Sequence, residues 1–84
     1  MEIKIIEENE NYLEIECDCD FSLLFYLSEL LNKEKGVSAK AFKDHPLFAK
    51  PRLIVESENP KEKLKEAIKK FRKQISEVKK ALKK

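Results

Sequence analysis

Apolar and polar residues alternate along two short runs near the start of the chain, at residues 2–7 and 12–17. Alternation with a period of two is the pattern of a β-strand that has one buried face. The residues between the two runs, Asn9-Glu10-Asn11, are typical of a turn. The sequence therefore predicts a hairpin with one face toward solvent, in which Leu13, Ile15 and Cys17 share a face.

After Cys17 the apolar residues take the spacing of a helix. Asp20 or Ser22 suits the N-cap of this helix, and Gly36 suits the left-handed residue that follows its end near Lys35. Two further strands are predicted at residues 37–42 and 52–56, with a loop between them that is longer than an ordinary hairpin turn. Asn59-Pro60 then suits the N-cap and first position of a second helix that could run to the C-terminus.

The order strand-strand-helix-strand-strand-helix predicts an α+β fold, in which a four-stranded sheet packs against two helices. The 84 residues of the chain predict a single domain, residues 1–84, with one small core. A domain of this size is marginally stable by itself, and we expect a partner to supply further stability.

The last helix has an apolar seam that is longer than one sheet can cover. The seam recurs at alternating spacings of four and three residues, which is the pattern of helices that pack on helices. Its members are Leu64, Ile68, Phe71, Ile75, Val78 and Leu82. The helix spans about 33 Å from residue 61 to residue 82, whereas a strand of five or six residues covers about 17–20 Å. The distal part of the seam therefore requires another covering element.

The first helix is apolar around most of its girth. Its core-type stripe consists of Leu23, Leu24, Leu27, Leu30 and Leu31, and Phe21, Phe25 and Tyr26 add apolar surface beside it. A small domain cannot bury such a helix on every side, and monomers rarely expose a patch of this kind. The two helices therefore predict a protein–protein interface, for which a thick local core is the alternative.

Charge is divided unevenly along the chain. Residues 1–42 include ten acidic and four basic residues, and residues 43–84 include six acidic and fourteen basic ones. A basic half can bind nucleic acid, or it can be the lysine-rich solvated face of a helix. Only Arg52 and Arg72 are arginine, the residue that groove and phosphate recognition favours, so the composition favours a solvated face.

Candidate catalytic, metal and membrane features are few. His45 is the only histidine, and the chain has neither a glycine-rich loop nor a Ser-His-acid order, so we expect no catalytic activity of its own and no cofactor. Cys17, Cys19 and the distant His45 do not provide four ligands at a zinc spacing, and no metal is expected. We expect the two thiols to be reduced. Neither a membrane span nor a signal peptide is apparent, which predicts a soluble, cytoplasmic protein.

Several of these segments together resemble subunit L of archaeal RNA polymerase, the small alpha-like subunit, which has counterparts in the eukaryotic nuclear polymerases. The most specific segment is Asp44-His45-Pro46-Leu47 followed by Pro51, between the third and fourth predicted strands. Residues 1–5, 11–16, 20–27 and 36–42 are similar to the family's strands and first helix, and the long last helix also fits. The resemblance covers nearly the whole chain.

The resemblance implies a non-catalytic assembly subunit of DNA-directed RNA polymerase with the fold of an alpha-like dimerisation domain. Such a chain forms a heterodimer with the large alpha-like polymerase subunit. The heterodimer is the platform for the catalytic subunits in transcription, so nucleic acid is contacted only indirectly. The implied pairing face consists of Leu23, Leu24, Leu27, Leu31, Phe71, Ile75, Val78 and Leu82. The loop from Asp44 to Pro51 would be structural or would touch neighbouring subunits.

The chain departs from the family pattern mainly in the first helix. Phe21 and Phe25 stand where the family usually has histidine and asparagine, and Ser28 lies near a usually basic position. Cys17-Asp18-Cys19 replaces an acidic, glycine-containing turn. These changes make the helix more apolar, which suits pairing and is compatible with a divergent lineage or a changed partner. Two other functions fit the residues: a nucleic-acid-binding protein that uses the basic helix, and a homodimeric scaffold that uses the seam on itself.

Overall fold

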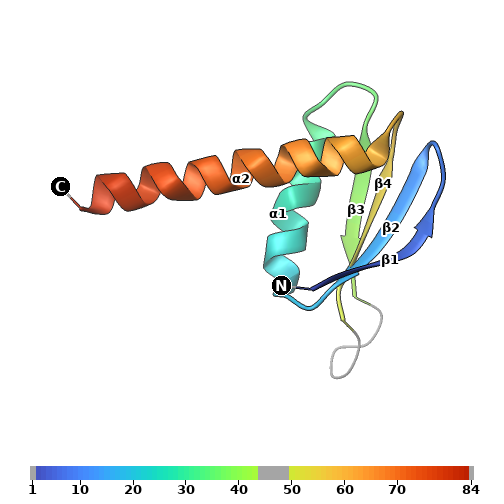
Figure 1. The fold of residues 1–84 in the computed structure, drawn as a ribbon, viewed down its shortest axis with the longest axis horizontal. Helices are drawn as coiled ribbons and strands as arrows, with labels where there is room; N and C mark the ends of the chain where they lie inside the picture. Colours follow the sequence, from blue (N-terminus) through green and yellow to red (C-terminus); the bar gives the residue numbers. More distant parts are fainter. Residues whose placement is uncertain (1, 44–49, 84) are drawn as a thin grey trace.

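The structure, a computed structural model, describes residues 2–43 and 50–83 and contains one antiparallel sheet of four strands in the order β1-β2-β4-β3. Both helices lie on the same side of this sheet (Figure 1). The elements are β1 (Ile3–Glu8), β2 (Tyr12–Cys17), α1 (Phe21–Asn32), β3 (Ser38–Phe42), β4 (Arg52–Glu56) and α2 (Pro60–Leu82). The predicted α+β order is confirmed.

The core lies between the sheet and the two helices. Alternate residues of β2 and β4 are buried, as the period of two in the sequence predicts. One stripe of α1 and the first half of α2 cover these residues from the helix side. The buried apolar residues are Leu13, Ile15, Cys17, Leu24, Leu27, Leu31, Leu53, Val55, Leu64 and Ala67.

Strand β1 differs from the prediction, because both of its faces are exposed. It is an edge strand, and β2 is the only element of residues 2–43 and 50–83 that it contacts. Its pairing with β2 runs through Ile5 and resumes at Glu7, which leaves Ile6 as the extra residue of a β-bulge. The helices pack over the inner strands and do not reach Ile3 and Ile5, so the predicted buried face of the hairpin belongs to β2 alone.

The helix ends agree with the sequence in position but not in every detail. Asp20 is the N-cap of α1, although its side chain makes no capping hydrogen bond and the N–H of Leu23 donates to its carbonyl oxygen instead (3.1 Å). Helix α1 ends at Asn32, earlier than the predicted Lys35, and Gly36 takes its positive φ of 82° in the turn that follows. Asn59 is the N-cap of α2 in a left-handed conformation (φ 50°), which asparagine tolerates better than most residues.

Asn32 explains why α1 ends early. Its Nδ2 donates to the carbonyl oxygen of Ala39 at 2.9 Å, and its Oδ1 accepts from the N–H of Ala39 at 2.7 Å. The side-chain amide thereby takes the place of a neighbouring strand at the outer edge of β3. Unpaired edge groups of this kind are a template for unwanted strand pairing, and Asn32 removes one pair of them.

We expect Asn32→Ala to lower the free energy of unfolding by about 1 kcal/mol, because two partly solvated hydrogen bonds are lost. Urea denaturation followed by circular dichroism measures the change. Glu29→Ala is the matched control, because Glu29 is an exposed residue of the same helix with no hydrogen bond or ion pair among the described residues. Equal effects of the two substitutions would contradict a specific role for the Asn32 amide.

Candidate protein–protein interface

Helix α2 is longer than the sheet on which it begins, and its C-terminal half projects past α1 (Figure 1). Only Pro60, Leu64 and Ala67 of this helix are buried. Beyond Phe71, which is partly buried against the core, the seam continues as Ile75, Val78 and Leu82 with exposed fractions of 41%, 54% and 80%. The distal seam, defined here as these last three residues, is therefore uncovered in the described part of the chain.

The middle of α2 is held against α1 by polar and aromatic contacts. The hydroxyl of Tyr26 donates a hydrogen bond to Oε1 of Gln74, and the Tyr26 ring meets the Phe71 ring edge-on with centroids 5.6 Å apart. Just after α1, the Glu34 carboxylate lies 3.4 Å from Nζ of Lys70 and 3.6 Å from Nζ of Lys63. These contacts set the direction in which the distal seam projects.

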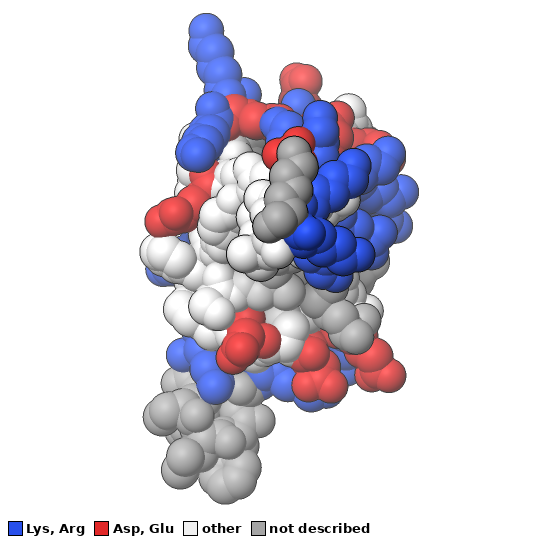
Figure 2. All heavy atoms as spheres, turned by 90° about the vertical axis from the view of Figure 1, so that its left-hand side faces the viewer, with Lys and Arg blue, Asp and Glu red and all other residues white. Residues whose placement is uncertain are grey.

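A second exposed apolar group lies on α1. Phe21 and Phe25 are one helical turn apart, their ring centroids are 6.2 Å apart, and both are exposed. Tyr26 lines an apolar hollow together with Phe71, Gln74, Ile75 and Val78. Figure 2, which views the molecule from the C-terminal end of α2, shows uncharged surface below and beside the helix end, with Lys and Arg gathered on its other flank. Exposed apolar surface of this extent on a small chain is typical of an interaction site.

The leucines of the predicted pairing face do not join this surface. Leu24, Leu27 and Leu31 have exposed fractions of 1%, 4% and 1%, and Leu23 is partly buried against the same core. The spacing of the three buried leucines matches one face of α1, and that face packs on the chain's own sheet. We therefore assign them to the core and take the aromatic flank of α1 in their place. The signal for that flank was present in the sequence as aromatic residues outside the leucine stripe.

The family-motif loop lies mostly outside the described residues. Asp44, His45, Pro46 and Leu47 fall in residues 44–49, which the structure does not describe. Pro51 is described and is buried, and its carbonyl oxygen accepts a hydrogen bond from the N–H of Cys17 at 3.0 Å. Pro51 thus joins the start of β4 to the end of β2.

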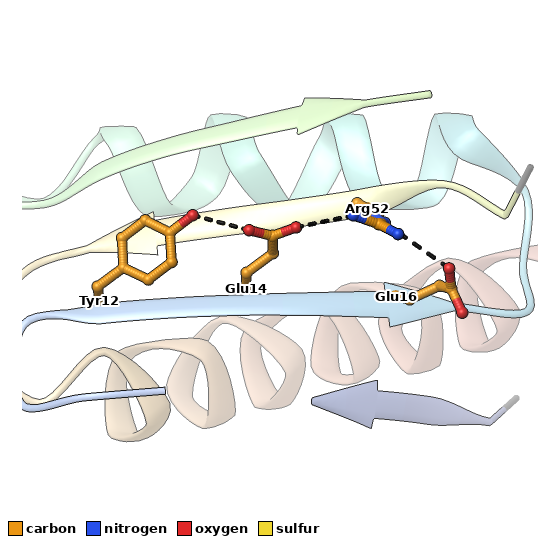
Figure 3. A network of polar contacts seen from close by, with 4 residues as sticks. All are labelled: Tyr12, Glu14, Glu16 and Arg52. Carbon is orange, nitrogen blue, oxygen red and sulfur yellow. Dashed lines mark hydrogen bonds and ion pairs between the residues drawn. The ribbon is translucent and has the colours of Figure 1, made fainter. Parts of the chain in front are cut away.

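A row of polar side chains lies on the sheet face opposite the helices (Figure 3). The Tyr12 hydroxyl donates to Oε1 of Glu14 at 2.8 Å, Nη1 of Arg52 donates to Oε2 of Glu14 at 3.1 Å, and Nε of Arg52 lies 3.7 Å from Glu16. The hydrogen bond to Glu14 raises the pKa of Tyr12 to about 12. The carboxylates are engaged by Arg52, so this row joins β2 to β4 and offers no free acid–base pair.

The cysteines have the environment of structural thiols. Cys17 is buried and Cys19 is half-buried, and neither forms a disulfide. Burial, followed by a hydrogen bond with Cys17, raises the pKa of the Cys19 thiol to about 12. In the described part of the chain, no three His, Cys, Asp or Glu side chains are grouped so that they could hold a metal ion. None of the helices in that part is both long and apolar enough to cross a membrane.

The structure separates core leucines from interface aromatics, and stability measurements can check this division. We expect Leu24→Ala to lower the free energy of unfolding of the isolated chain by about 2–5 kcal/mol, because it opens a cavity. Phe25→Ala should change it by less than about 0.5 kcal/mol, because Phe25 is 50% exposed. Urea denaturation of both variants decides, and a large loss with Phe25→Ala would place that ring in the core.

The raised pKa of Cys19 predicts slow alkylation. A thiol with a pKa of about 12 has about a thousandfold less thiolate at pH 8 than a free cysteine. Iodoacetamide should therefore label Cys19 at least about 100-fold more slowly in the folded chain than in concentrated urea, as followed by peptide mass spectrometry. The folded-state rate should rise about tenfold per pH unit between pH 8 and 10. A rate that levels off near pH 9 would contradict the raised pKa.

Comparison with known proteins supports the fold. The sequence matches no protein-family model and no curated protein. Among solved structures, the chain is similar to the crystal structure of DNA-directed RNA polymerase subunit L from Thermoplasma acidophilum, with a TM-score of 0.83 and 23% sequence identity. The similarity covers 98% of this chain and 85% of that one. The chain therefore has the fold of RNA polymerase subunit L, as the resemblance in the sequence predicts.

Proposed function

We propose that the protein is a non-catalytic assembly subunit of a cytoplasmic DNA-directed RNA polymerase, formed as one alpha-like dimerisation domain. It pairs with a large alpha-like subunit, and the pair is the platform for the catalytic subunits. The likeness of fold to subunit L supports this proposal over nearly the whole length of the chain. Transcription is then the process in which the protein takes part, without direct contact with nucleic acid.

The observation that carries the proposal is the uncovered distal seam of α2. Ile75, Val78 and Leu82 continue the heptad spacing of the buried Leu64 without a break. A helix with such a seam packs against another helix, because each seam residue inserts between residues of the facing helix. The chain's own sheet and α1 cover only the first half of the seam. A partner helix over the second half would bury the rest.

The aromatic flank of α1 supplies the second part of the proposed pairing surface. Phe21 and Phe25 are apolar and rigid, and aromatic residues are enriched in interface cores. Their position beside the core leucines allows a partner to extend the hydrophobic core without changing it. The proposed pairing face therefore consists of Phe21, Phe25, Tyr26, Phe71, Ile75, Val78 and Leu82, with Leu23 at its border.

The proposed absence of catalysis rests on the state of the acidic groups. Glu14 and Glu16 are engaged by Arg52, and Glu34 by two lysines. A general acid or base needs a free group of suitable pKa beside a substrate. In this proposal the chain contributes surface, and other subunits supply the reacting groups.

Co-expression with the large alpha-like subunit of the source organism tests the proposal. After nuclease treatment, we expect size-exclusion chromatography with light scattering to show a stable one-to-one complex. A monomer that ignores the large subunit would overturn the proposal. Nucleic acid retained by the chain before nuclease treatment would favour the alternative of a basic-helix binder, and a dimer of the chain alone would favour a homodimeric scaffold.

The double variant Ile75→Glu with Val78→Glu should weaken this pairing at least about 100-fold, because unpaired charges would be buried in the contact. The isolated variant should keep the circular dichroism spectrum of the sheet, because both side chains are exposed. Lys73→Gln with Lys80→Gln is the matched control, since it changes the net charge equally on the face of the helix away from the seam. Undiminished pairing of the seam variant would show that the distal seam is not the contact.

A further inference from the structure

We infer that the partner helix of α2 is flanked by acidic residues, and that a basic flank of α2 selects it over a second copy of this chain. This inference rests on the proposed pairing through the distal seam and concerns the chemistry of the partner. The basic flank is defined as Lys65, Arg72 and Lys79, which directly follow the seam residues Leu64, Phe71 and Val78.

The two sides of the seam differ in charge. Residues that follow the seam at heptad spacing are all basic, whereas those on the opposite side, Ala67, Gln74 and Ala81, are all uncharged. In paired helices these two sets of positions face the partner beside the seam, and their charges decide which partners are accepted. Figure 2 shows the same asymmetry, with Lys and Arg on one flank of α2 and uncharged surface on the other.

The uncharged side is occupied by the chain's own α1. Ala67 is buried, and Gln74 accepts the hydrogen bond from the Tyr26 hydroxyl. An element from another chain therefore reaches the distal seam from the side of the basic flank. On that side a hollow is lined by Phe71, Ile75 and Ser76 together with Arg72 and Lys79. A side chain that enters this hollow meets apolar surface and two cations.

The cations of this hollow have no partner among the described residues. Lys65 lies 3.8 Å from Glu62, within its own helix. For Arg72 and Lys79, no carboxylate in residues 2–43 and 50–83 is within ion-pair distance. Carboxylates on the partner would complete these two positions, and opposite charges across an interface favour one partner over others.

The same flank disfavours a second copy of the chain. Two copies that pair by a twofold axis bring identical surfaces together. When their α2 helices cross antiparallel, Arg72 and Lys79 of one copy face the basic flank of the other. Like charges in such a contact are repulsive. The basic flank thus makes the seam selective for a partner that differs from this chain, as a heteromeric platform requires.

Charge reversal on the flank tests the inference. The double variant Arg72→Glu with Lys79→Glu should raise the Kd for the large alpha-like subunit at least about tenfold at about 50 mM salt, and less than about threefold at about 500 mM salt. Lys73→Glu with Lys80→Glu is the control, because it makes the same charge change on the face away from the seam. Its Kd should stay within about twofold of the unmodified chain. Equal losses for both variants would overturn the inference and leave the proposed pairing intact.

If the unmodified chain does not bind the large subunit at all, the proposed function fails and two synthetic helices decide the inference. They share one leucine seam and have either glutamate or lysine at the flanking positions. Fluorescence anisotropy should show tighter binding of the glutamate-flanked helix to the unmodified chain, and the reverse preference for Arg72→Glu with Lys79→Glu. Equal binding of both helices, or binding of neither, would overturn the inference.

Discussion

The length of α2 relative to its sheet is the constraint on which the rest of the structure depends. A helix of 23 residues spans about 34 Å, whereas the inner strands have five or six residues. The sheet buries Leu64 and Ala67 and covers only the first turns, so the rest of the seam must find its contacts elsewhere. Helix α1 fixes the direction of this excess length, because the edge-on contact of Tyr26 with Phe71 and the shared Glu34 carboxylate depend on geometry. A small chain thereby presents one assembly surface in one orientation.

Much of the fold follows from the sequence because local patterns coincide with tertiary contacts. The alternation in β2 and the seam of α2 both predict which residues are buried, and the structure agrees at Leu13 and Leu64. The exposure of β1 could not be predicted, because Ile5 alternates with polar neighbours as in a buried strand and only the sheet order places it at the edge. The role of Asn32 depends on Ala39, which no periodicity connects to it and which is near only in the fold.

The division of α1 between core and interface shows a further limit of periodicity. Its leucines and phenylalanines are all strongly apolar, so hydrophobicity alone does not separate Leu24, which is buried, from Phe25, which is half exposed. The chain's own sheet covers the stripe that contains the leucines, and the aromatic residues remain on the flank. The family resemblance assigned the pairing face to leucines, whereas the fold leaves the aromatic residues free to take that part.

Folding and assembly are coupled in a chain of this design. The side chains of Val78 and Leu82 in the last turns of α2 are more than half exposed, and helical segments of that length are marginal in water without tertiary packing. A partner that covers the distal seam removes apolar surface from water and also stabilises the helix that presents it. The last turns would therefore be most stable in the complex, and the affinity of the pair includes the free energy of ordering them.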